Sequence, residues 1–159
     1  MSSKAKSKGT LCLPMYHRVG PVRVNMDEQH ILDIYKEYIQ AFESKDYHTI
    51  ADLCRTPFFA SSPSGTTIFG NREELLQGFS TLRSSLDIDG YVGSQLNQLD
   101  YTSVAETAGT LLVDFHRINH EGTRYFHGKA LYIFQMRDKK TEIIGIVVLD
   151  DNTASSWKD

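Results

Sequence analysis

Two histidines and one aspartate are the side chains of this sequence whose types could together hold a metal ion. Asp114 and His116 are separated by one residue, and His127 lies beyond the turn-forming segment 120–122. In an antiparallel hairpin this spacing places His116 across from His127, and two imidazoles beside a carboxylate suit a transition metal. The same pairing sets Lys129 across from Asp114, which marks the outward face, and the sequence fixes no further strong ligand. We therefore expect no metal here.

The sequence contains none of the common catalytic motifs, namely a glycine-rich phosphate loop, a nucleophile elbow, HExxH or CxxC. His48 is expected at the surface, and Asp150 and Asp151 are expected to end a strand in solvent. The two cysteines, Cys12 and Cys54, are too few for a disulfide framework and favour a reducing, cytoplasmic location. Cys54 is expected as a small apolar residue of the core. No cofactor is expected.

Three helices are predicted to position these residues. From Asp27 the apolar residues recur every three or four positions, which indicates an amphipathic helix. Its apolar stripe comprises Ile31, Ile34, Tyr35, Tyr38, Ile39 and Phe42. A second, shorter helix includes Cys54 and ends at Pro57, because the residue before a proline is pushed out of the helical region. Asn71 caps a third helix, with Glu74 completing a capping box, and Gly90 stops it.

Strands are predicted from β-branched and aromatic residues between turn signals. The turn at 63–65 separates two short strands, and after Gly90 the pattern changes to a series of longer strands. The predicted strands cover residues 57–62, 66–69, 91–101, 104–118, 124–135 and 143–149. Consecutive strands with short connections form an antiparallel meander.

The long hairpin predicts which side chains share a face. A two-residue turn at Glu121-Gly122 pairs Leu111 with Tyr132, Val113 with Ala130, and Phe115 with Gly128. That face is apolar or small throughout, so it suits burial under helices. The other face pairs Asp114 with Lys129 and His116 with His127. The sequence thus predicts an α+β fold in which three helices, on the N-terminal side, pack on the concave face of a cone-shaped, curved antiparallel sheet.

Length and charge define the domain organisation. The chain has 159 residues, of which 40% are hydrophobic, enough for one core. We expect a flexible basic leader over 1–25, whose alternative is a non-native extension before Met26, then one domain over 26–151 and a frayed tail over 152–159. The leader holds five Lys and Arg and no acid, so residues 26–159 carry 12 basic and 20 acidic side chains. This acidic body argues against nucleic-acid binding, and no apolar run is long enough to span a membrane.

The order of elements and several phrases of the sequence resemble the nuclear-transport-factor-2-like superfamily, which includes ketosteroid isomerases, scytalone dehydratases, limonene epoxide hydrolases and SnoaL-like polyketide cyclases. The resemblance covers about residues 27–151. The phrases are Tyr38-Ile39-Gln40-Ala41-Phe42, the turn 59–65, Gly70-Asn71-Arg72-Glu73-Glu74-Leu75 and Tyr132-Ile133-Phe134-Gln135-Met136. The resemblance implies a cystatin-like α+β fold with a cavity. It specifies function weakly, because one fold hosts many chemistries.

Comparison with the isomerases implies which residues line that cavity. Tyr38 falls at the position of their hydrogen-bonding tyrosine, and Tyr132 falls near that of their protonated acid. Ser62, just before Pro63, falls where they have the general base, and a serine hydroxyl does not accept a proton from carbon without a neighbouring base. Tyr38, Ser62 and Tyr132 are therefore expected as polar contacts of the pocket. Phe59 and Phe115 are expected in its apolar wall.

Two functions remain open. The first is binding of an apolar small molecule in this pocket, with isomerase, dehydratase or cyclase activity as an option. The second is a non-catalytic interaction module that forms a homodimer through the outer sheet face. The side chains of Thr110, Leu112, Leu131 and Ile133 would make that face too apolar for open water.

Overall fold

Six strands form one curved, unclosed sheet in the order β2-β1-β6-β5-β4-β3 in the computed structural model, which describes residues 26–149. The strands are β1 (Cys54–Ser62), β2 (Gly65–Phe69), β3 (Tyr91–Ala105), β4 (Ala108–Asn119), β5 (Arg124–Arg137) and β6 (Lys140–Val148). Neighbouring strands are antiparallel except β1 and β6, which run parallel. The predicted α+β class is confirmed, with a mixed sheet. The expected leader over 1–25 and tail over 152–159 lie outside the described residues.

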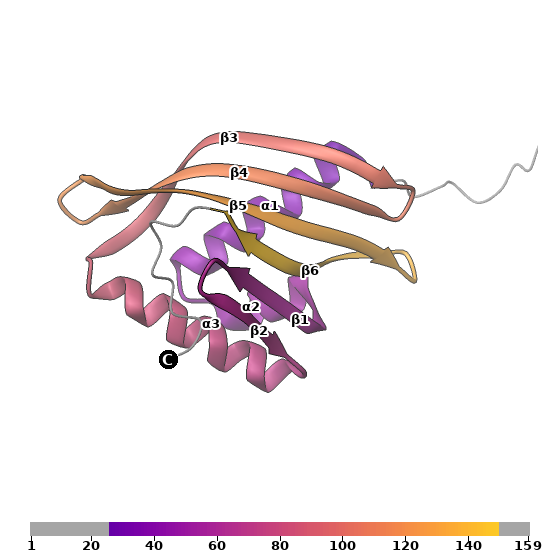
Figure 1. Ribbon diagram of the computed structural model, residues 1–159, viewed down its shortest axis with the longest axis horizontal. Helices are drawn as coiled ribbons and strands as arrows, with labels where there is room; N and C mark the ends of the chain where they lie inside the picture. The colour runs from indigo at the N-terminus through magenta and orange to yellow at the C-terminus, as the bar shows by residue number, and fades with distance from the viewer. Residues whose placement is uncertain (1–25, 150–159) are drawn as a thin grey trace, which may run out of the picture.

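Three helices cover the concave face, and the long strands β3, β4 and β5 arch over them (Figure 1). They are α1 (Glu28–Glu43), α2 (Tyr47–Leu53) and α3 (Arg72–Asp87). The Asn71 side chain accepts a hydrogen bond from the Glu74 amide at 3.0 Å, as the capping box predicts. None of the helices within residues 26–149 is long and apolar enough to cross a membrane.

The predicted register of the long hairpin is confirmed. Leu111 pairs with Tyr132, Phe115 with Gly128, and His116 with His127. The turn itself differs from the prediction, because a bulge after Arg117 widens the loop. A hydrogen bond from the Asn119 amide to the Thr123 carbonyl, at 3.1 Å, closes the end of this loop. The wider loop and the bulge compensate, so the inward and outward faces stay as predicted.

Two element boundaries differ from the prediction. The second helix ends at Leu53 rather than at Pro57, because Cys54 pairs with Ile143 and begins β1. Cys54 is buried as expected, although in a strand. The turn expected at 100–103 lies instead after Ala105, since Tyr101 points inward and its hydroxyl donates to the Met26 carbonyl at 3.0 Å. Pairing across this point keeps β3 continuous.

Arg83 fixes the end of α1 beside α3. The residue is 4% exposed, and its guanidinium donates to the Phe42 carbonyl at 3.1 Å and the Glu43 carbonyl at 3.2 Å. These carbonyls belong to the last turn of α1, where helices have no internal donors for them. Asp87 completes the set by accepting from Arg83 at 2.6 Å. The position of α1 against the sheet is therefore defined at this end by hydrogen bonds.

Candidate functional site

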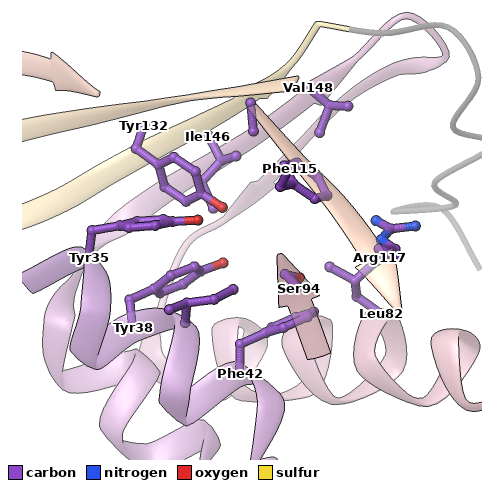
Figure 2. Close-up of a pocket in the computed structure, with 12 residues that line it drawn as sticks. Tyr35, Tyr38, Phe42, Leu82, Ser94, Phe115, Arg117, Tyr132, Ile146 and Val148 are labelled. Atoms are coloured by element: carbon purple, nitrogen blue, oxygen red, sulfur yellow. The ribbon is translucent and has the colours of Figure 1, made fainter. Parts of the chain in front are cut away.

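A pocket opens between α1 and the concave face of the sheet (Figure 2). The space within it that water-sized spheres can occupy is about 60 Å³, and the volume reaches about 540 Å³ only when all space between the surrounding atoms and the open solvent at its mouth are included. The helices contribute Tyr35, Tyr38, Ile39, Phe42 and Leu82, and the strands contribute Ser94, Phe115, Arg117, Ala130, Tyr132, Ile146 and Val148. The lining is therefore apolar and aromatic, with a small number of polar groups, as is usual for sites that bind small molecules.

Three tyrosines form the polar end of this pocket. Tyr35 and Tyr38 are three residues apart in α1, so they lie on one helix face, and Tyr132 projects from β5 toward them. The ring centroid of Tyr132 is 5.0 Å from that of Tyr35 and 5.4 Å from that of Tyr38, in edge-to-face contact. All three side chains are buried. Figure 2 shows their hydroxyls pointing the same way, into the pocket.

Burial makes these phenols weak acids. Desolvation raises the pKa of Tyr132 to about 12 and raises the pKa values of Tyr35 and Tyr38 well above their ordinary value. The neighbouring hydroxyls of Tyr38 and Tyr35 lower the pKa of Tyr132 and so offset part of this rise. Tyr132 therefore keeps its proton near neutral pH, and within residues 26–149 its hydroxyl donates to no carbonyl or carboxylate. It can therefore donate to an oxygen atom placed in the pocket.

Arg117 lies across the pocket from the tyrosines (Figure 2). It follows Phe115 by two residues in β4, so both side chains point to the concave face. Its guanidinium carbon lies 4.4 Å from the ring centroid of Phe126 and 6.0 Å from that of Phe115. Gly128 makes room for these rings, because a Cβ there would come within 2.6 Å of Phe126 and 3.0 Å of Phe115. Burial lowers the pKa of Arg117, which nevertheless stays cationic at neutral pH.

The remaining polar side chain of the lining is that of Ser94. Its hydroxyl is 2.8 Å from the Tyr91 hydroxyl, and its amide donates to Glu43 at 2.9 Å. Among the lining residues within 26–149 there is no Asp, Glu or His. Phenols with raised pKa values and a guanidinium are poor bases near pH 7. The described lining can donate hydrogen bonds and attract negative charge.

The structure brings three of the five expected site residues together. Tyr38, Tyr132 and Phe115 line the pocket. Ser62 lies elsewhere, at the end of β1, where its hydroxyl is 2.7 Å from that of Ser64 in an exposed turn. Phe59 lies on the opposite face of the sheet, with its ring packed over Gly145.

Tyr35 and Arg117 line the pocket but were not expected there. Tyr35 is on the same predicted stripe as Tyr38, so helical spacing was a sufficient signal. Arg117 is two residues from Phe115 on the inward face, and a cation on an otherwise apolar face is an informative exception to strand alternation. A search for charged residues among the inward positions would have found it.

The histidine pair forms a cluster on the outer face. The rings of His116 and His127 stack with centroids 4.5 Å apart, and His127 Nε2 is 2.7 Å from Asp114. Asn97 donates to His116 Nδ1 and to Asp114, each at 2.8 Å. Within the described residues no group of three His, Cys, Asp or Glu side chains is arranged to hold a metal ion.

Comparisons with known proteins identify the fold. Residues 27–151 match a family described as NTF2-like protein (DUF6841). No curated protein sequence matches the chain. A Nostoc punctiforme protein of unknown function with a cystatin-like fold superposes with a TM-score of 0.64 at 14% identity, over 80% of this chain and 94% of that one.

Two other solved structures are similar at the same level. A Xanthomonas campestris protein put forward as a calcium/calmodulin-dependent protein kinase II association domain gives a TM-score of 0.58 at 12% identity, over 83% of this chain and 94% of that one. A Novosphingobium aromaticivorans protein put forward as an aromatic ring hydroxylase gives 0.57 at 12% identity, over 74% and 84%. At these identities the similarity establishes the fold alone.

The buried tyrosines predict a loss of stability at alkaline pH. A folded-state pKa of about 12 for Tyr132 exceeds the value of about 10 for an unfolded tyrosine. Its contribution to stability is therefore complete below about pH 10 and is lost as pH rises toward 12, with a slope of at most about 1.4 kcal/mol per pH unit. In urea unfolding at several pH values, Tyr132→Phe should reduce this slope. Parallel pH dependence of the wild type and the variant would contradict the assignment.

Proposed function

This chain belongs to the NTF2-like family DUF6841, and we propose that it binds an apolar, ring-containing small molecule in the pocket between α1 and the sheet. One observation carries the proposal: the hydroxyls of three buried tyrosines point together into an apolar pocket (Figure 2). Buried polar groups are normally hydrogen-bonded to the protein or to water. A hydroxyl left with a proton to donate is suited to a carbonyl or hydroxyl oxygen of a ligand.

The walls suggest the apolar part of that ligand. Phe42, Leu82 and Phe115 surround the space in front of the hydroxyls, with Ile146 and Val148 along β6. Aromatic rings of the wall could stack on or meet a ligand ring edge-on, as they do with each other. A ring that carries one oxygen substituent would place that oxygen at Tyr132 and its apolar body against these residues.

Binding is favoured over proton-transfer catalysis by the same residues. An isomerase, dehydratase or cyclase needs a group that removes a proton, and the lining residues within 26–149 supply donors and a cation instead. Ser62, at the position of the isomerase base, lies in the exposed β1–β2 turn. Recognition of an oxygen-bearing ring compound is therefore the proposed role.

The binding site is tested with 2-acetylnaphthalene, a neutral ketone, added to the full-length protein and followed by NMR. Saturable shifts are expected for the methyl groups of Ala130, Ile146 and Val148. Tyr132→Phe should weaken binding about fivefold to tenfold, because one neutral hydrogen bond contributes about 1 kcal/mol. The matched control is Tyr47→Phe, at the start of α2 and outside the pocket lining, which should leave the affinity unchanged. Absence of saturable shifts, or equal affinity in Tyr132→Phe, would refute the proposal.

The outer sheet face supports a second proposed role, association of two copies of this chain. Apolar side chains gather on it from five adjacent strands: Phe59, Ile68, Leu112, Leu131, Ile133 and Val147. Ile68 is 68% exposed, and Phe59 packs over Gly145 rather than into the core. A broad apolar face is characteristic of an interaction surface. Two-fold pairing would bury it on both copies at once, and the polar cluster of Asp114 and His127 would lie at its edge.

Dimerisation is tested by light scattering at micromolar concentration. The wild type should have the mass of two chains, and Leu131→Glu should shift it to one chain, since a carboxylate cannot be buried unpaired at the centre of the face. Thr123→Glu, in the exposed hairpin loop, is the control and should remain dimeric. A monomeric wild type would exclude this role and leave the pocket proposal unaffected.

A further inference from the structure

We infer that the ligand of this pocket carries a carboxylate group and that Arg117 binds it. The inference rests on the proposed binding function and adds the chemical class of the ligand. Its basis is the place of a guanidinium group in the wall of an apolar pocket, opposite the tyrosine hydroxyls (Figure 2).

The other buried or half-buried arginines of the fold have acidic partners. Arg55 Nε lies 2.9 Å from Glu142, and Arg83 Nη1 lies 2.6 Å from Asp87. Even the exposed Arg72 is 2.8 Å from Asp52. Arg117, which is half-buried, forms no salt bridge or hydrogen bond with a carboxylate or carbonyl among residues 26–149, and the carboxylate of Asp89 acts on it only through a longer-range electrostatic interaction. A cation that is partly removed from water and lacks an ion-pair partner favours an anionic ligand, because burial of an unpaired charge is costly.

The surroundings of Arg117 orient it for such a partner. Its guanidinium lies over the ring of Phe126, with Phe115 nearby, and an aromatic face attracts a cation while leaving its N–H groups available. A planar guanidinium binds a carboxylate through two parallel hydrogen bonds. The rings thus restrict the motion of the group without using its donors.

The arrangement also defines the shape of the ligand. Arg117 lies on β4 at one side of the pocket, and Tyr132 lies on β5 beside the two tyrosines of α1 at the other side, with apolar residues between them. A ring compound with a carboxylate at one end would fill this space. An oxygen at its other end would accept from Tyr132.

The chain itself offers a competing source of carboxylate. Asp150 and Asp151 closely follow Val148, which lines the pocket, in the sequence. Their chemistry is the same as that of the inferred ligand group. The experiment therefore includes the double variant Asp150→Asn/Asp151→Asn, which retains the length of the chain and removes both charges.

A matched pair of probes tests the inference: naphthalene-2-carboxylate and 2-acetylnaphthalene have nearly the same shape and differ in charge. The full-length wild type should bind the carboxylate at least tenfold more tightly than the ketone, because charge-assisted hydrogen bonds are about twice as strong as neutral ones. Arg117→Met should remove this preference, and Arg117→Lys should retain a smaller one. Arg124→Met, which removes an exposed arginine of β5, is the control and should keep the full preference.

Each other outcome overturns the inference in a distinct way. Equal binding of both probes by the wild type, or a preference that persists in Arg117→Met, refutes the role of Arg117 while the proposed function stands. A preference that emerges only in the Asp150→Asn/Asp151→Asn variant shows that the chain supplies the carboxylate itself. Failure of both probes to bind refutes the proposed function and the inference together.

Discussion

The edge-to-face contact of Tyr132 with Tyr35 and Tyr38 determines how closely α1 approaches the sheet. The rings meet at centroid distances of 5.0 and 5.4 Å. Smaller apolar side chains at these positions would let α1 move toward the sheet and close the space that the hydroxyls now occupy. Arg83 holds the other end of α1 through its last carbonyls. The pocket lies between α1 and the strands beside these contacts, and the absence of a side chain at Gly128 leaves room for the rings of Phe115 and Phe126. The pocket is the consequence of both constraints.

Side-chain periodicity predicted most of the fold. The stripe of α1, the Asn71 cap and the β4–β5 register were readable because each depends on neighbours within one element or one hairpin. The parallel pairing of β1 with β6 could not be predicted from the sequence, because it joins segments that are distant in the chain, such as those of Ala60 and Ile146. The turn after Ala105 lacks glycine and proline, so it gave no local signal, whereas the contact of Tyr101 with Met26 extends β3 past the expected turn.

Side-chain periodicity also predicted part of the site. Tyr38, Tyr132 and Phe115 lie on inward positions that periodicity identifies. Ser62 was placed by alignment to a catalytic position, but the strand end carries it into an exposed turn. The net negative charge of residues 26–159 gave no indication that Arg117 lines the pocket. Distant charges are screened within about 8 to 10 Å in physiological salt, so a bound ligand would experience mainly the charges near the pocket, namely Arg117 and the carboxylates of Asp89 and Glu43 that act on the residues of its wall.

A crystal structure of the protein with naphthalene-2-carboxylate would locate both ends of the bound ligand. We expect the ring between α1 and the sheet against Phe115, with its carboxylate oxygens about 2.7 to 2.9 Å from the guanidinium of Arg117. Density for the compound only on the outer sheet face, or a pocket in which Arg117 is paired with an acidic side chain of the protein itself, would contradict this expectation.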